Sequence, residues 1–268
     1  MIKDNIENKT LSIRISTDGF CFCSYTPSLP DSLKYFFYKP EKDLTLTTNL
    51  QKGVELCPFI SDSENYDVKV IIEANEFTTI PIEYDDRQSH KTFYRHCFPQ
   101  SETRFEVVAN RLNAQGITVL FPVEKALYEY IQRLGSTTFY SSMSILSGLL
   151  TSKPVEEDSY MLAFFQGNLA MYISIKDGKL QLANAFRSES GQDSIYYLLS
   201  IWKEQGFSQE DDTLYLCGDS GVEANIMTIG RFIKRCKRLN ANQLFPSTLL
   251  NKLEGIPFDL QALILCEY

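Results

Sequence analysis

The first part of the chain alternates apolar and polar residues as a β-strand does. The alternating positions are Leu11, Ser12, Ile13, Arg14, Ile15 and Ser16. This pattern predicts a strand with one apolar and one polar face. Asp18-Gly19 then predicts a tight turn into a second strand over residues 20–25. We expect a third strand over residues 34–38, a helix within the polar segment 41–53 and a strand over 68–73, in the order βββαβ.

A similar order recurs in the second half of the chain. Strands are predicted over residues 161–165, 169–175 and 180–186, joined by the turns Gln166-Gly167-Asn168 and Asp177-Gly178. A helix ending near Gly206 and a strand over 214–217 follow. The next segment has apolar residues at helical spacing, which predicts a helix with one buried face. These residues are Val222, Ile226, Ile229, Ile233 and Cys236. The second half therefore reads βββαβα.

The middle of the chain connects these two units. Two strands, or one long bent pair, are expected over residues 105–110 and 117–121. A helix is expected from Pro122 to Leu134 with Gly135 as its stop, because proline favours a helix start and glycine a helix end. A short strand and a short helix are expected over residues 137–140 and 143–150. The polar stretch that follows predicts a boundary between two domains, residues 1–152 and 153–268.

Composition and charge narrow the class of protein. The 268 residues include 34 acidic and 26 basic side chains, a net charge of −8, which disfavours broad attraction to nucleic acid or anionic lipid. The polar start and the absence of a long apolar stretch argue against a signal peptide and a membrane span. The cysteines, seven in number, include Cys21 and Cys23 on one strand face, which we interpret as small hydrophobic residues in a reducing cytoplasm. We therefore expect a cytoplasmic protein.

Three segments, residues 11–22, 160–172 and 214–222, carry a family resemblance. A duplicated βββαβα unit with a glycine-containing turn after the first strand of each half resembles the actin-like ATPase superfamily. The chain is more closely similar to an uncharacterised domain-of-unknown-function family from Bacteroides-like bacteria, and distantly similar to actin-like assembly proteins of type IV pilus systems. The resemblance implies an α/β protein with a duplicated RNase H-like fold, whose two subdomains face each other across a cleft.

The resemblance also implies where a nucleotide would bind. In that superfamily the turns of the first hairpins hold the nucleotide phosphates through backbone N–H groups, and an Asp near the end of each first strand organises Mg²⁺ and the attacking water. The loop between a strand and a helix covers the adenine or ribose. Carried onto this sequence, the nucleotide-binding positions are Thr17, Asp18, Gly19, Gly167, Gly218, Asp219 and Gly221. For residues 218–221, the competing interpretation is that Asp219 or Ser220 caps the helix that follows.

The chemistry of this sequence departs from that pattern. In the preferred register the first Asp is replaced by Arg14, and in the alternative register by Thr17. No acidic residue lies between Asp158 and Asp177, so the second hairpin lacks a metal-organising carboxylate. Since such groups place the metal and stabilise charge, useful hydrolysis is not expected. We therefore predict no catalytic residue, no bound metal and no cofactor beyond weak affinity for ATP, and a non-catalytic scaffold or binding module with an unknown protein partner.

Two alternatives remain open at the level of sequence. The first is an active ATPase or kinase whose carboxylates have moved to Asp18 and Asp219. The second is a module that binds nucleic acid or an acidic partner through a basic helix face. The residues of that face are Arg231, Lys234, Arg235 and Arg238. We expect the histidines, His90 and His96, and the neighbouring Cys97 to be surface or packing residues, because paired metal-ligand spacings are missing.

Overall fold

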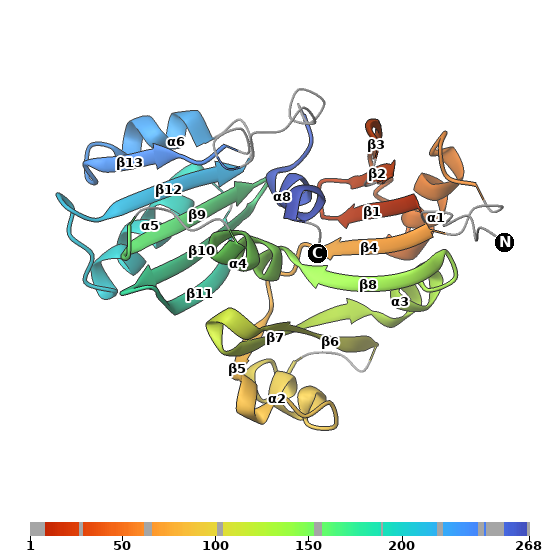
Figure 1. The fold of residues 1–268 in the computed structure, drawn as a ribbon, viewed down its shortest axis with the longest axis horizontal. Coiled ribbons are helices and arrows are strands. Elements are labelled where there is room, and N and C mark those ends of the chain that lie inside the picture. The colour runs from red at the N-terminus through yellow and green to blue at the C-terminus, as the bar shows by residue number, and fades with distance from the viewer. Residues whose placement is uncertain are drawn as a thin grey trace, which may run out of the picture.

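The computed structural model describes residues 9–26, 29–61, 66–100, 104–152, 157–188, 190–218, 222–240, 244 and 255–266. Two five-stranded sheets lie side by side, and a smaller three-stranded sheet lies below the first of them in the view of Figure 1. We call the part built on the first five-stranded sheet lobe 1 and the part built on the second lobe 2.

The sheet of lobe 1 has the strand order β3-β2-β1-β4-β8. Its strands are β1 (Lys9–Ile15), β2 (Phe20–Thr26), β3 (Leu29–Tyr38), β4 (Tyr66–Ile72) and β8 (Gly135–Ser141). The first three strands are antiparallel, whereas β1, β4 and β8 are parallel. Helices α1 (Leu46–Leu56) and α4 (Ser142–Ser152) follow β3 and β8, and α3 (Lys125–Ile131) precedes β8.

Lobe 2 repeats this plan, with the strand order β11-β10-β9-β12-β13. Its strands are β9 (Tyr160–Gln166), β10 (Leu169–Lys176), β11 (Lys179–Arg187), β12 (Thr213–Gly218) and β13 (Arg235–Arg238). Its helices are α5 (Gly191–Glu204) and α6 (Val222–Ile229), and α8 (Phe258–Cys266) ends the described chain. The predicted fold class is confirmed: each sheet has three antiparallel strands followed by two parallel ones. The last strand of lobe 1, β8, ends at Ser141 and the first of lobe 2, β9, begins at Tyr160. The division into domains at residue 152 stays a prediction.

The three-stranded sheet is an insertion between β4 and β8 that the sequence pattern does not reveal as a separate layer. Its order is β5-β7-β6, and all its pairings are antiparallel. Its elements are β5 (Thr78–Pro81), η1 (Ile82–Tyr84), α2 (His90–Cys97), β6 (Phe105–Leu112), η2 (Asn113–Gln115) and β7 (Ile117–Glu124). The two strands expected over residues 105–110 and 117–121 are confirmed as β6 and β7, but they belong to this insertion.

The helix expected from Pro122 to Leu134 is shorter than its apolar pattern indicates. Pro122 lies within β7 and faces Val107 of β6 across the ladder, and the helix begins only at Lys125. Gly135 is the first residue of β8. A Cβ atom at Gly135 would lie 2.3 Å from the carbonyl oxygen of Tyr66, so this glycine allows two parallel strands to approach closely.

The expected helix from Val222 to Cys236 is wrong beyond Ile229, and the basic helix face is wrong with it. Residues 235–238 form β13, which pairs parallel to β12 and completes the sheet. Sheet pairing has overridden the helical spacing of the apolar residues. On the strand, Arg235 and Lys237 alternate with Cys236 and Arg238 instead of joining one basic stripe. The ammonium group of Lys237 pairs with the Glu157 carboxylate at 2.8 Å, which neutralises part of the positive charge of β13.

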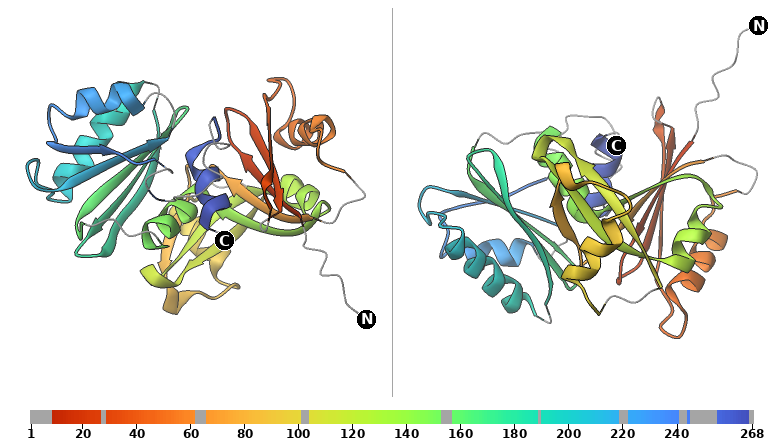
Figure 2. Two further views of the ribbon diagram at one scale, coloured as in Figure 1. Left: turned by 45° about the horizontal axis from the view of Figure 1, so that its top comes forward. Right: turned by 90° about the horizontal axis from the view of Figure 1, so that it is seen from below.

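Helix α8 lies between the two lobes and joins their cores (Figures 1 and 2). It contacts β1 of lobe 1, β12 of lobe 2 and helix α4. Its buried residues are Phe258, Asp259, Leu260, Ala262, Leu263 and Ile264. A helix that is apolar on nearly all sides is one that the fold encloses. The largest apolar cluster includes residues of both five-stranded sheets and of α8, so the lobes share one core. Among the described helices, none has the length and apolar character needed to cross a bilayer.

Candidate functional site

The polar face of β1 lies under α8. Its alternating side chains, Thr10, Ser12, Arg14 and Ser16, are all buried. The opposite face, with Ile13 beside Phe22 of β2, packs toward α1, where the Phe22 ring lies in contact distance of Gly53. Alternation of polar and apolar residues usually marks a strand with one face in solvent, but both faces of β1 are covered. A polar stripe buried in this way needs partners within the protein.

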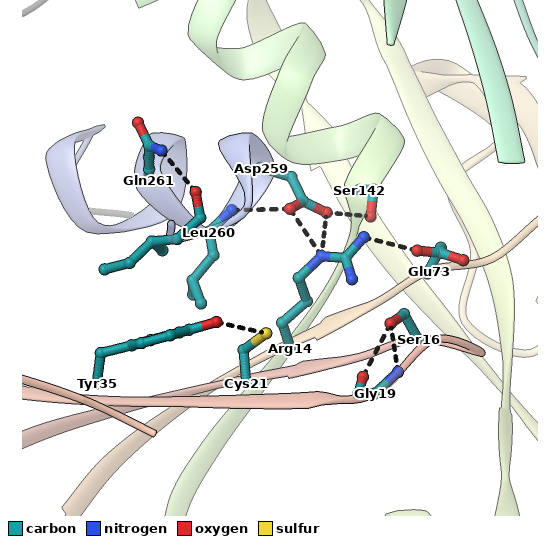
Figure 3. Close-up of polar contacts among 11 residues, drawn as sticks. Arg14, Ser16, Gly19, Cys21, Tyr35, Glu73, Ser142, Asp259, Leu260 and Gln261 are labelled. Atoms are coloured by element: carbon teal, nitrogen blue, oxygen red, sulfur yellow. Dashed lines mark hydrogen bonds and ion pairs between the residues drawn. The ribbon is translucent and has the colours of Figure 1, made fainter. Parts of the chain in front are cut away.

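Arg14 finds its partners on two different elements (Figure 3). Its Nε donates to both carboxylate oxygens of Asp259 on α8, at 2.8 and 2.9 Å. Its Nη2 donates to Oε2 of Glu73, the residue after β4, at 2.6 Å. The three side chains are 2%, 0% and 3% exposed for Arg14, Asp259 and Glu73, respectively. We call these three residues the Arg14 cluster.

Asp259 is held by two further donors. The Ser142 hydroxyl, at the start of α4, donates to Oδ2 at 2.8 Å, and the backbone N–H of Leu260 donates to Oδ1 at 2.9 Å. A carboxylate in the first turn of α8 also meets the positive end of the helix dipole. A fully buried charge is tolerated when it is paired and hydrogen-bonded in this way. The cluster thereby ties together β1, β4, α4 and α8.

The cluster contains one cation and two acids, and this imbalance affects Glu73. Burial, together with the negative charges of Asp259 and Asp18, raises the pKa of Glu73 to about 7 against the attraction of Arg14. The two acids raise the pKa of Arg14, despite its burial, so its guanidinium stays charged. The buried thiol of Cys21, opposite Arg14 in the β1–β2 ladder, accepts a hydrogen bond from the Tyr35 hydroxyl, and burial raises its pKa.

This geometry is unsuited to a divalent cation. Glu73 and Asp259 converge from different elements, as metal ligands do, but the guanidinium of Arg14 lies between them and is hydrogen-bonded to both. Within the described ranges, no group of three or more His, Cys, Asp or Glu side chains is arranged to hold a metal. A metal ion that used both carboxylates would have to displace Arg14 and would leave its buried charge without partners.

The glycine turns of the two lobes meet at the cleft. The β1–β2 turn, residues 16–19, is closed by a bond from the Ser16 backbone N–H to the Gly19 carbonyl at 3.2 Å. The β9–β10 turn contains Gly167, whose φ is +55°. A Cβ at Gly167 would lie 1.8 Å from Oδ2 of Asp18, so this carboxylate sits directly against the glycine. Asp18 and Gly167, both predicted nucleotide-binding positions, are thus brought together.

The other predicted positions have different surroundings. Thr17 is exposed beside Asp18, and Gly19 is covered by the Phe37 ring, which would lie 2.3 Å from an added Cβ. Gly218 ends β12, where a Cβ would lie 1.9 Å from the carbonyl oxygen of Phe165 on β9. Close strand approach therefore accounts for Gly218 without a ligand. Asp219 and Gly221 lie outside the described residues.

Comparison with known proteins gives the family. The model of a family of proteins of unknown function, DUF3822, matches residues 1–236. The chain belongs to the DUF3822 family. A crystal structure of a Bacteroides thetaiotaomicron protein, with an actin-like ATPase fold and unknown function, is 28% identical to this DUF3822 protein. It matches with a TM-score of 0.80 over 97% of this chain and 96% of the other. The predicted family resemblance is therefore confirmed.

A more distant match extends only to the fold. A chain of the PilM–PilN type IV pilus biogenesis complex is 11% identical to this DUF3822 protein, with a TM-score of 0.53 over 97% of this chain and 98% of the other. No protein of curated function matches the sequence. The actin-like fold is thus shared across these proteins, and the site of the DUF3822 protein has to be interpreted from its own residues.

Two acids of the Arg14 cluster are missing from the sequence-based predictions. Glu73 is visible there only as the end of a strand, and Asp259 lies 245 positions from Arg14. One signal could have found Asp259: it is the single charged residue in the apolar run Phe258–Cys266. A carboxylate in such a run is buried when the helix is enclosed, and it then needs a cationic partner. For this DUF3822 protein, the buried Arg14 is that partner.

Replacing Arg14 tests the cluster as a unit. Arg14→Met leaves two buried acids without their cation, and we expect a loss of about 3–5 kcal/mol in unfolding free energy, measured by urea denaturation. The triple variant Arg14→Met/Glu73→Gln/Asp259→Asn removes all three charges and is expected to recover at least half of that loss. A loss below about 1 kcal/mol in the single variant, a size usual for exposed pairs, would contradict the account.

Gly167 tests the contact between the two turns. Gly167→Ala adds a methyl group where the Asp18 carboxylate lies and places alanine at a left-handed φ, so we expect destabilisation of about 1–2 kcal/mol. In the Asp18→Gly background only the backbone strain remains, so the same substitution should cost measurably less. Equal costs in both backgrounds, from a double-mutant cycle of urea unfolding, would show that the turns do not touch. Gly178→Ala is the matched control, because its φ is +70° and its added Cβ meets open space.

Proposed function

We propose that this protein is a non-catalytic actin-like binding module or scaffold, a pseudo-enzyme whose nucleotide cleft is occupied by its own side chains. The observation that carries the proposal is the Arg14 cluster. It puts a permanently charged guanidinium, bonded to Glu73 and Asp259, at the carboxyl ends of β1 and β4. Ligands of open α/β sheets bind outside the carboxyl ends of the strands, so this is where catalytic groups would be needed.

The chemistry of phosphoryl transfer supports this proposal. Transfer from ATP depends on Mg²⁺, held by oxygen ligands, to neutralise charge and align the reacting groups. In lobe 1 the two converging carboxylates, Glu73 and Asp259, are bonded to Arg14, and Asp18 lies against Gly167. In lobe 2 the nearest acids along the hairpin, Asp158 and Asp177, lie at the end of β9 and β10 away from the Gly167 turn. The length of these strands, roughly 20 Å, separates them from the cleft.

The contacts between the lobes also favour binding over turnover. The Asp18 carboxylate lies against the turn that would hold phosphate oxygens, so an incoming phosphate meets a like charge there. The apolar core that the lobes share through α8 opposes the hinge motion with which kinases close on substrate. The contact of Asp18 with the Gly167 turn and the shared apolar core both favour a single conformation of the two lobes.

The partner in this proposal is another protein, and the location is the cytoplasm. The distant structural match comes from a complex of PilM with PilN, which is an example of this fold engaged by a protein partner. A reducing location is in keeping with the cysteines, all of which are free thiols in the described chain. Binding of nucleic acid is not favoured, since the basic helix face does not exist and the net charge is −8.

A nucleotide titration tests the proposal against the ATPase alternative. With millimolar ATP and Mg²⁺, we expect no Mg²⁺-dependent rise in melting temperature and no phosphate release above a buffer blank. Asp18→Ala removes the like charge from the cleft, so we expect weak nucleotide binding in this variant, still without hydrolysis, because Arg14 remains. The matched control is Asp43→Ala, an exposed acid of lobe 1 outside the cleft. Mg²⁺-dependent stabilisation of the wild type that is lost in Asp18→Ala would overturn the proposal in favour of an enzyme.

A further inference from the structure

A pocket of about 340 Å³ lies beside the Arg14 cluster, at the carboxyl ends of β1 and β4. Residues 15–17 and 72–76 form one side, and β7 with the start of α3 forms another. Arg187, at the end of β11, reaches the pocket from lobe 2. Its volume is in the range of small-molecule sites, and its position is where open α/β sheets bind ligands.

The wall of the pocket combines apolar side chains with acids. Its apolar part includes Ile15, Val123 and Leu127, which are almost completely buried. Three of its residues are glutamates, Glu73, Glu76 and Glu124. The Glu124 side chain, just before α3, makes no capping hydrogen bond to that helix. The pocket therefore offers an apolar wall and negative charge.

Glu73 connects this pocket to the buried cluster. Its side chain is 3% exposed, and Oε2 accepts from Arg14, whereas Oε1 has no hydrogen-bond donor among the described residues. Since Oε1 is not one of the fully enclosed polar atoms that lack a partner, a donor can reach it from the pocket. A donor that enters through the pocket would satisfy Oε1 and would add the positive charge that the cluster lacks.

Arg187 does not supply that charge. Its Nη2 lies 3.5 Å from Oδ1 of Asn75, at the limit of a hydrogen bond, and it forms no salt bridge with the pocket glutamates. One cation against three acids leaves the lining negative. A neutral or anionic ligand would leave the negative charge of Glu73 without a second cationic partner, whereas a cationic donor would form an ion pair with it.

We propose that this pocket binds a small organic cation, an alkylammonium or guanidinium group on an apolar stem, with the cation at Glu73 and the stem against Ile15, Val123 and Leu127. This deepens the proposed function by naming a ligand class for the binding module, and it rests on the cleft being a binding site. It does not depend on whether ATP binds, so the nucleotide titration and the test below can fail separately.

The test compares three probes of equal length and different charge: n-pentylammonium, n-pentanol and pentanoate. Binding is measured by isothermal titration and by saturation-transfer NMR on the full chain. We expect pentylammonium to bind about tenfold more tightly than pentanol, and pentanoate not to bind. Equal affinity for the amine and the alcohol would overturn the proposal, because the carboxylate would then contribute nothing. Preference for pentanoate would overturn it as well.

The dependence on pH identifies the acid that is responsible. The groups that face Glu73 are Arg14 from β1, Asp259 from α8 and Asp18 from the turn, and burial with the two acids raises the Glu73 pKa to about 7. As the pH falls through that value Glu73 is protonated while the ammonium group stays charged, so affinity for pentylammonium should decline. Affinity for pentanol should not change. An amine affinity that is constant between about pH 8 and pH 5 would exclude Glu73 as the partner.

Substitutions complete the test. Glu73→Gln should lower the affinity for pentylammonium about tenfold and leave the affinity for pentanol unchanged. If this variant does not fold, Glu124→Gln, outside the buried cluster, should still weaken amine binding to a smaller degree. The matched control, Glu106→Gln, removes an acid that lines a different hollow beside α2 and should have no effect. Equal losses of pentylammonium affinity in Glu124→Gln and Glu106→Gln would show that only the net charge of the protein matters, and would overturn the proposed binding site.

Discussion

The buried guanidinium of Arg14 is the constraint on which the rest of the cleft depends. A charge enclosed by β1, β2 and α8 cannot be left without partners, and an arginine cannot become neutral as a buried lysine can. The fold therefore has to bring Asp259 and Glu73 to it, from the last described helix and from the end of β4. Helix α8 is fixed in register by this pairing, since Asp259 is the only charged residue of its apolar sequence.

The two lobes share one strand order, and the side chains that lie between them bond mainly to one another. The close approach of backbone at Gly218 follows from the pairing of β12 with β9, which requires a residue without a side chain there. The side chains at the cleft bond to one another: Arg14 to its two acids, and Asp18 against Gly167. The lobes of a protein built in this way are held together by internal contacts, which suits a rigid surface for binding.

Much of the fold could be predicted from local pattern. Strand alternation and tight turns such as Gln166-Gly167-Asn168 predicted the hairpins that begin both lobes, because these signals act between neighbours in sequence. The failures have tertiary causes. Residues 235–238 are a strand because β12 offers an open edge, and the three-stranded insertion forms a layer of its own that no periodicity announces.

The candidate site was predictable only in part for the same reason. Arg14 stood out because it reverses the charge expected at the end of a first strand. Its partners could not be assigned, since Glu73 and Asp259 come from distant parts of the chain and only the folded sheet brings them together. The contact of Asp18 with Gly167 likewise depends on how the lobes meet. Arg14 and Asp18 could be singled out from the sequence, whereas Glu73 and Asp259 became visible only in the fold.

The most direct test of this account is a crystal structure of the protein grown with Mg²⁺ and a non-hydrolysable ATP analogue. The account predicts that Arg14 keeps both of its carboxylate partners, that Asp18 stays against Gly167, and that no phosphate density appears between the two turns. A Mg²⁺ ion coordinated by Glu73 or Asp259, with the guanidinium displaced and phosphates bound by both turns, would contradict it.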